Sequence, residues 1–547
     1  MVRENDISDF QNLPSCAVVF IKQVLKKMRY RRKVRQDVKE ELTAHFADEL
    51  KDCETDEDKE EKAKQLIADF GDAKLLAVLL RRAKKRCRPL WRTAVVRSFQ
   101  VFGIMVLYCC VCFIPLLVGK PTISVNYIDW LNELVKSDRN ESDNARPFYE
   151  KAAALYVENP KWLDKNRAKW PTDLNDVEQK SLSDWLEDNQ GALESLREGS
   201  KRPDFWNEYQ NGEATVNNTQ LYSDLMASGF VDNVMEILST YKSLTRALRW
   251  QVLYEAYNGD IETALRDCIA ITKFGGHLQG HGLLIEQLVG FALEGLANST
   301  IFILLDRVDV PADILKSTYQ ELNEQFDTQE SVLSLESEKV FWYDQIQRTF
   351  TDDGNGGGRM LARGMPYVVT DDWKENLWRF VSFNYPDRQE VVGSIDKYFG
   401  RFAEKLTKTP WELRDETIDD QVWNEVDITP IMLKIQIPAH ERVGQITWRM
   451  KSGRKALLTV LAVMRYEKEN GRYPANLSEL VEAGYLKRLP MDPYSDGPLV
   501  YRRTESGFLL YSLGTNLKDD GGELGLRGGK PRMWADDGDW IFWPVAE

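Results

Sequence analysis

A long uncharged run interrupts the mixture of apolar and polar positions about one fifth of the way along the chain. Residues 98–119 read SFQVFGIMVLYCCVCFIPLLVG and carry no formal charge. A helix of this length extends about 33 Å and can cross a hydrocarbon core of about 30 Å. A helix buried in a protein core is the alternative, but such helices seldom stay uncharged for so long. The pattern predicts one transmembrane helix at 98–119.

Helical spacing characterises the residues before this run. Apolar residues recur at intervals of three and four between residues 13 and 88, which predicts a set of short helices. Gly71 suits a helix C-cap, and Asp72 suits the N-cap of the next helix. We expect residues 1–97 to form one helical domain that ends in a basic juxtamembrane segment.

The pattern changes twice after the apolar run. Residues 120–437 show amphipathic helical spacing, with a sustained apolar-periodic stretch at 231–305. Residues 438–547 begin with a long helix and change after Asn470-Gly471 to strands and turns, and the pattern predicts a hairpin of the segments 499–501 and 508–512. The expected fold is mainly α, with a cytoplasmic helical domain, one transmembrane helix, an extracytoplasmic helical region and a small α+β C-terminal module with an antiparallel sheet.

Charge indicates the orientation of the predicted transmembrane helix. Residues 1–97 carry 23 Lys and Arg against 17 Asp and Glu, whereas the rest of the chain carries 49 against 69. Eight basic residues and no acidic residue lie between Arg81 and Arg97, so the positive-inside rule places the N-terminus in the cytoplasm. A nucleic-acid patch is the alternative for this segment, but its place beside an apolar run favours anionic lipid, and we expect no nucleic-acid partner.

The N-terminal segment resembles a known bacterial domain. The order VRQDVKEELTAHFADEL, an acidic stretch and AKQLIADFGDAKLLAVLLRRA is similar to the HAAS or permease-prefix domain, which precedes membrane segments in many bacterial proteins. The matching positions are Glu40, Glu41, Leu42, His45, Phe70, Gly71 and Asp72. The resemblance implies a helical signalling or interaction module. With the predicted orientation, it places the chain in a bacterial inner (cytoplasmic) membrane with its large C-terminal part extracytoplasmic.

Polar residues beside a helical hairpin are the candidates for a ligand groove. The segment LYEAYNGDIETALRDCIAI resembles a single tetratricopeptide hairpin, and His277 and His281 follow it at i, i+4 spacing. Together with Glu286 in the next apolar run, they are the raw material of a metal or hydrolytic site. Glu286 and Gln287 are polar groups inside that apolar run, so they must find partners or face a groove. The flanking glycines favour instead a loop or a kinked helix with a structural role. The motifs HExxH, GxSxG, GxxxxGK[ST] and SxxK with its partners are absent.

The C-terminal module resembles the globular end of the major pseudopilin of type II secretion. Its motifs follow the order of that family: GRYP at 471–474, LPMDPY at 489–494, YSLG at 511–514 and DDGG at 519–522. The resemblance implies a long helix packed on a small antiparallel sheet with a calcium-binding loop. Two features differ from the family, because an acidic position is Asn516 here and the pilin-type signal is absent, which argues against assembly into a pseudopilus.

Five aspartates near the C-terminus are the candidate calcium ligands: Asp519, Asp520, Asp536, Asp537 and Asp539. Calcium takes six to eight oxygen ligands, and carboxylates from two neighbouring loop segments can supply most of them. Five uncompensated carboxylates would repel one another, so either a cation neutralises them or the loop stays open to solvent. The sequence admits both a calcium site and a solvated acidic loop.

Two classes of function fit these features. Two modules that resemble interaction domains bracket a helical region without a recognisable catalytic constellation. This arrangement favours a sensing, scaffold or interaction role with envelope or cytoplasmic protein partners. The alternatives are an extracytoplasmic hydrolase with its site in the helical groove and an accessory component of a type II secretion-like system. The sequence assigns no catalytic residue and no cofactor other than calcium.

Overall fold

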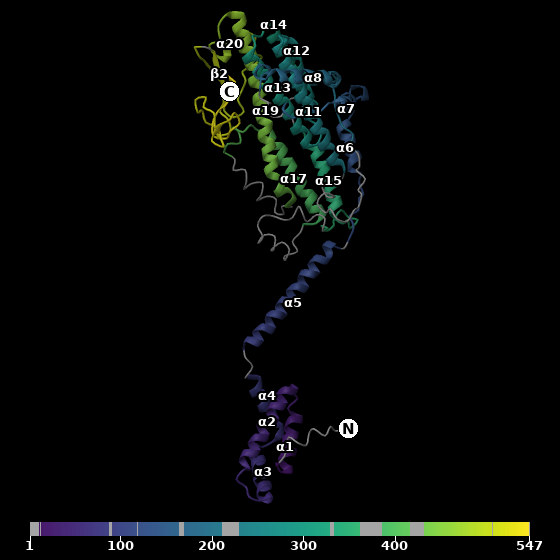
Figure 1. Ribbon diagram of the computed structural model, residues 1–547, viewed down its shortest axis with the longest axis vertical. Helices are drawn as coiled ribbons and strands as arrows, with labels where there is room; N and C mark the ends of the chain where they lie inside the picture. Colours follow the sequence, from purple (N-terminus) through teal and green to yellow (C-terminus); the bar gives the residue numbers. More distant parts are fainter. Residues whose placement is uncertain are drawn as a thin grey trace. The chain divides into compact units, whose positions relative to one another are not determined.

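The computed structural model describes residues 10, 12–86, 90–117, 119–163, 169–209, 229–328, 333–361, 386–415, 431–505 and 507–545. These residues are mainly helical, with a small antiparallel sheet near the C-terminus (Figure 1). The chain divides into two compact units, Met1–Val111 and Cys112–Glu547. The expectation of a mainly α fold that ends in an antiparallel sheet is therefore confirmed.

The first unit begins with four short helices, α1 (Ser15–Lys27), α2 (Arg32–Glu49), α3 (Asp56–Phe70) and α4 (Ala73–Arg86), and also includes most of α5 (Leu90–Leu117). The apolar faces of the four short helices form one core, in which Ile21 and Phe46 are fully buried. The predicted break between α3 and α4 is confirmed. Gly71 ends α3 with a φ of 69°, a conformation that glycine adopts without steric cost. Asp72 then caps α4, since its Oδ1 accepts a hydrogen bond from the Lys74 amide at 2.9 Å.

Two helices of the described ranges are long and apolar enough to cross a membrane by length and composition. One is the window Ala94–Val111 of α5 (Leu90–Leu117), and none of this window is buried. The other is α13 (Leu284–Arg307), of which 67% is buried within the second unit. The sequence pattern singles out the first of these two, and packing distinguishes them, because α13 is a core helix whereas α5 exposes its apolar side chains.

Besides α13, the described part of the second unit contains the helices α6 (Tyr127–Lys136), α7 (Arg146–Leu155), α8 (Asp176–Asp188), α9 (Gln190–Ser200), α11 (Gly229–Tyr257), α12 (Ile261–His277), α14 (Ala312–Thr328), α15 (Glu336–Thr349), α17 (Arg388–Thr407), α19 (Ile431–Asn470) and α20 (Leu477–Glu482). Short 3₁₀ turns, η3 (Glu141–Asp143) and η5 (Pro171–Asp173), lie between α6 and α8. Figure 1 shows α11, α12, α13 and α19 side by side, and these helices contact one another in that order.

The predicted helical hairpin is formed by α11 and α12. Gly259 turns the chain with a φ of 90°, and the Asp260 side chain accepts a hydrogen bond from the Thr263 amide at 3.1 Å. The helix α12 continues through Gly275 and ends at His277, so the loop expected at the glycines begins only after the histidine. A Cβ on Gly275 would lie 2.7 Å from the Gly290 carbonyl oxygen, so this glycine lets α12 and α13 approach closely.

The sheet follows the long helix α19. Strands β1 (Val500–Arg503), β2 (Phe508–Ser512) and β5 (Trp540–Trp543) are antiparallel in the order β1-β2-β5, and the predicted hairpin is confirmed. A second pair, β3 (Leu526–Arg527) and β4 (Lys530–Pro531), is short. Side chains of α19, β2 and β5 belong to the same hydrophobic core as those of α11 to α13. The boundary expected between residues 437 and 438 therefore lies inside one compact unit.

Candidate functional site

His277, at the end of α12, is engaged by the protein on both ring nitrogens. Its Nε2 lies 3.0 Å from the Arg202 carbonyl oxygen, which can only accept, so Nε2 carries the proton. Its Nδ1 lies 2.6 Å from the Tyr149 hydroxyl and therefore accepts from it. Burial lowers the pKa of His277 to about 4, so the ring is neutral around pH 7. A ring held in this way has no free nitrogen for a metal or a substrate.

Glu286 lies in the first turn of α13 and accepts three hydrogen bonds. The Asn207 amide donates to Oε1 at 2.7 Å, the Leu283 backbone amide donates to Oε2 at 2.8 Å, and the Tyr209 hydroxyl also donates to Oε2. Burial raises the pKa of this carboxyl group. The side chain thus caps its own helix and anchors the segment that precedes residue 210.

Gln287 clamps two loops against α13. Its Nε2 donates to the carbonyl oxygens of Gly282 and Ser334 at 2.8 and 2.7 Å. Its Oε1 accepts from the amides of Ser334 and Gly280 at 2.9 and 3.3 Å. All four hydrogen-bonding positions of this buried amide are filled by backbone groups, so Gln287 has a structural role here.

Three of the four expected groove residues meet, but in a closed space. His277, His281 and Glu286 line a hollow of about 10 Å³, which is about the size that one water molecule requires. The two histidines also line a more open polar groove of about 520 Å³, beside Arg139 and Asp204. Burial lowers the pKa of His281, and the Arg139 charge lowers it further. Among the four expected residues, His281 is the one whose side chain lines the 520 Å³ groove and makes no hydrogen bond within the described residues.

The five aspartates of the C-terminal loop separate into two groups. Asp539 is fully buried, its Oδ2 accepts from the Gly522 amide at 2.7 Å, and its Oδ1 has no hydrogen-bond partner among the described residues. Burial raises the pKa of Asp539, and the charges of Asp519 and Asp520 raise it further. These three carboxylates are therefore neighbours.

The other two aspartates are engaged elsewhere. Asp536 pairs with Arg449 at 3.1 Å, and Asp537 accepts from the Leu526 amide at 2.8 Å. In the described ranges, no group of three His, Cys, Asp or Glu side chains is arranged to hold a metal ion. A calcium ion at this loop would need backbone or water oxygens as ligands in addition to Asp539, and calcium commonly accepts such ligands. The calcium site stays a prediction.

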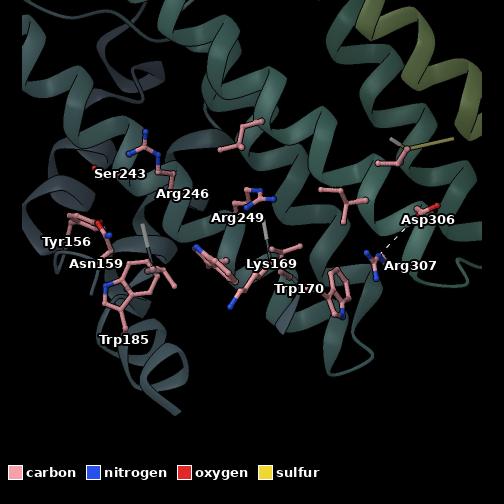
Figure 2. Close-up of a pocket in the computed structure, with 16 residues that line it drawn as sticks. Tyr156, Asn159, Lys169, Trp170, Trp185, Ser243, Arg246, Arg249, Asp306 and Arg307 are labelled. Atoms are coloured by element: carbon pink, nitrogen blue, oxygen red, sulfur yellow. Dashed lines mark ion pairs between the residues drawn. The ribbon is translucent and has the colours of Figure 1, made fainter. Parts of the chain in front are cut away.

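A cavity of about 770 Å³ lies between α11, α13 and the segment that joins α7 to α8 (Figure 2). Its volume falls in the range of pockets that bury small organic ligands. The lining residues are Tyr156, Asn159, Leu163, Lys169, Trp170, Trp185, Ser243, Arg246, Arg249, Trp250, Leu253, Leu296, Ile303, Asp306, Arg307 and Val545. No sequence motif marks any of them as a site.

The aromatic wall of this cavity is fixed by hydrogen bonds. The Trp185 indole donates to the Val157 carbonyl oxygen at 3.0 Å, and the same carbonyl accepts from the Asn189 amide at 3.2 Å. The Trp170 backbone amide donates to the Asp173 carboxylate at 3.0 Å, which fixes the turn that carries this indole. The wall is thus formed before any ligand binds.

Positive charge predominates on the rest of the lining. Four lining side chains are cationic, namely Lys169, Arg246, Arg249 and Arg307, whereas Asp306 is the only carboxylate among the lining residues that the structure describes. Asp306 lies 3.9 Å from Arg307. Arg249 is 9% exposed and donates to the Thr300 hydroxyl at 3.1 Å, and burial lowers its pKa.

A sequence signal for this cavity exists but is weak. The segment LTRALRW places Arg246 and Arg249 within the apolar-periodic stretch, where cations are uncommon unless they face a partner or a cavity. Trp250 belongs to the same segment, but Trp170 and Trp185 come from a different part of the chain, so their approach to the arginines depends on the tertiary fold. Comparison of the chain with models of protein families, with curated protein sequences and with solved structures finds no match in any of the three.

Proposed function

We propose that this chain is a single-pass protein of a bacterial inner membrane and that it has a sensing, scaffold or protein-interaction role. In this proposal, the four-helix unit is cytoplasmic, α5 crosses the membrane and the second unit is extracytoplasmic. The observation that carries the proposal is the exposure of α5. Phe99, Ile104 and Leu107 are 72, 68 and 65% exposed, and a soluble protein does not leave a long apolar helix uncovered.

Charge and packing support the same arrangement. The basic segment from Arg81 to Arg97 contains no acidic residue, which suits the anionic cytoplasmic leaflet. In the first unit, Leu75, Val78 and Leu79 of α4 are exposed at i, i+3 and i+4, and an apolar stripe of this kind suits a protein partner.

The contacts of the expected groove residues favour a non-enzymatic role over a hydrolase. His277 has neither nitrogen free, and Glu286 is held by three donors. Turnover of any substrate in a broad hydrolase panel by the purified chain, if abolished by Glu286→Ala, would overturn this part of the proposal. An accessory role in a type II secretion-like system and calcium at the C-terminal loop rest on the resemblance of the C-terminal module.

Reporter fusions at the C-terminus test the topology. A phosphatase that is active only outside the cytoplasm should be active when fused after Glu547, and a green fluorescent protein that folds only in the cytoplasm should stay dark. Fluorescence without phosphatase activity would contradict the proposal.

Charged substitutions in α5 test its role as the anchor. The double variant Ile104→Lys/Leu107→Lys should move the chain from the membrane fraction to the soluble or aggregated fraction, since a lysine at the centre of a span costs about 2.5–3.5 kcal/mol. Val177→Lys is the matched control, because Val177 is 79% exposed on α8 of the second unit. A double variant that stays in the membrane as the control does would refute the anchoring role of α5.

A further inference from the structure

We infer that the cavity between α11, α13 and the α7–α8 segment is a binding site for a small organic anion with an aromatic body. The inference deepens the proposed function, because it names the class of ligand that the second unit would sense. It rests on three properties of the cavity: its size, its rigid aromatic wall and its excess of cationic side chains.

The size of the cavity selects a small ligand. A volume of about 770 Å³ accommodates a molecule of one or a few rings, whereas a folded protein partner would need a far larger surface. Its floor is apolar, with Leu253 of α11 and Leu296 and Ile303 of α13 in the lining. Burial of a ring system against this floor is favourable by the hydrophobic effect.

The aromatic wall suits a flat ring. Figure 2 shows Trp170 and Trp185 on the side of the cavity opposite Arg246 and Arg249. Trp250 of α11 also lines the cavity and is 3% exposed. Because Trp185 is held by its hydrogen bond to Val157, it presents its ring without a large loss of side-chain entropy on binding.

The cations suit a carboxylate or phosphate group. Lys169, from the segment before α8, and Arg246 of α11 both line the cavity (Figure 2), and each can donate charge-assisted hydrogen bonds to an anionic group. Arg249 adds a positive charge in a poorly hydrated position, where an ion pair gains more than in water. A cationic ligand would be repelled by these side chains.

Equilibrium dialysis of the full chain in phosphatidylcholine nanodiscs tests the inference. The probes are 1-naphthyl phosphate, the neutral 1-naphthol and inorganic phosphate, with empty nanodiscs as the blank. We expect saturable binding of 1-naphthyl phosphate, and at least tenfold weaker binding of the other two, because one lacks the charge and the other lacks the ring.

Variants assign the binding to the cavity. Arg246→Gln/Lys169→Gln should weaken binding of 1-naphthyl phosphate about tenfold or more, since charge-assisted hydrogen bonds are lost. Arg266→Gln is the matched control, because Arg266 is an exposed arginine of α12 paired only with Glu262 among the described carboxylates, and it should bind as wild type does. Far-ultraviolet circular dichroism checks that each variant is folded.

Three results would overturn the inference: no saturable binding of 1-naphthyl phosphate, equal binding of 1-naphthol, or unchanged affinity in the folded double variant. Equal binding of 1-naphthol would refute the preference for an anion and leave a sensing role in place. The reporter fusions decide the topology independently, so failure of the ligand inference and failure of the proposed function are distinguishable.

Discussion

The ion pair between Glu294 of α13 and Arg454 of α19 should be a major determinant of the stability of the second unit. Arg454 donates from Nε and a terminal nitrogen to the two Glu294 carboxylate oxygens at 2.6 Å each. The side chains are 6 and 0% exposed, and Gln279, in the turn after α12, bonds to both partners at 3.0 Å. This one cluster therefore joins the helical region to the long helix that carries the sheet.

Arg454→Met removes the cation but leaves the carboxylate buried. Glu294 would keep only the Gln279 amide among its described donors, so its lost hydration would no longer be compensated. Removal of one partner of such a pair costs about 3–5 kcal/mol. The double variant Arg454→Met/Glu294→Leu should lose less, about 2 kcal/mol, since two apolar side chains replace two charges and the neutral Gln279 amide loses its partners.

Urea unfolding followed by tryptophan emission measures these effects. All tryptophans except Trp91 lie in the second unit, so the emission reports on its unfolding. Arg266→Met is the control, because the pair of Arg266 with Glu262 is exposed at 61 and 66% and such pairs contribute about 1 kcal/mol or less. A loss in Arg454→Met no greater than in the control, or a double variant less stable than the single one, would refute the reasoning.

Three further predictions concern pH and calcium. The free energy of unfolding should fall as the pH drops from about 6.5 towards 4, because His277 takes up a proton in the unfolded chain at a higher pH than in the native chain. Urea titrations should show a smaller fall in His277→Gln, and equal falls would contradict this. Glu255→Gln should stabilise the chain by about 1–3 kcal/mol at pH 8 and not at pH 4. Burial and then the charge of Asp267 raise the pKa of Glu255 to about 7, so above that pH the native state must hold a costly charge. No gain in stability at pH 8 would contradict this prediction. Millimolar calcium should raise the melting temperature of the wild-type chain but not of Asp539→Asn, and an unchanged value in both would indicate a solvated loop.

The sequence by itself determined the features that depend on neighbouring residues. The Gly71-Asp72 break, the α11–α12 turn at Gly259-Asp260 and the β1–β2 hairpin occur where the pattern places them. Each depends on backbone preferences and hydrogen bonds within a few residues, so the local sequence contains the necessary information. The mainly α fold with a C-terminal antiparallel sheet follows from the same local signals.

Only the tertiary structure decided which polar and apolar residues face one another. Length and composition admit both α5 and α13 as spans, and the packing of α13 in the core separates them. The spacing of His277 and Glu286 suggested a site, but Tyr149, Arg202, Asn207 and Tyr209 occupy their polar atoms from other segments.

The 770 Å³ cavity depends on the tertiary structure for the same reason. Its tryptophans and arginines come from α8, α11, α13 and the segment before α8, which meet only when the helices pack. Contacts between distant segments depend on the volumes and hydrogen bonds of the whole core, and no local pattern encodes them.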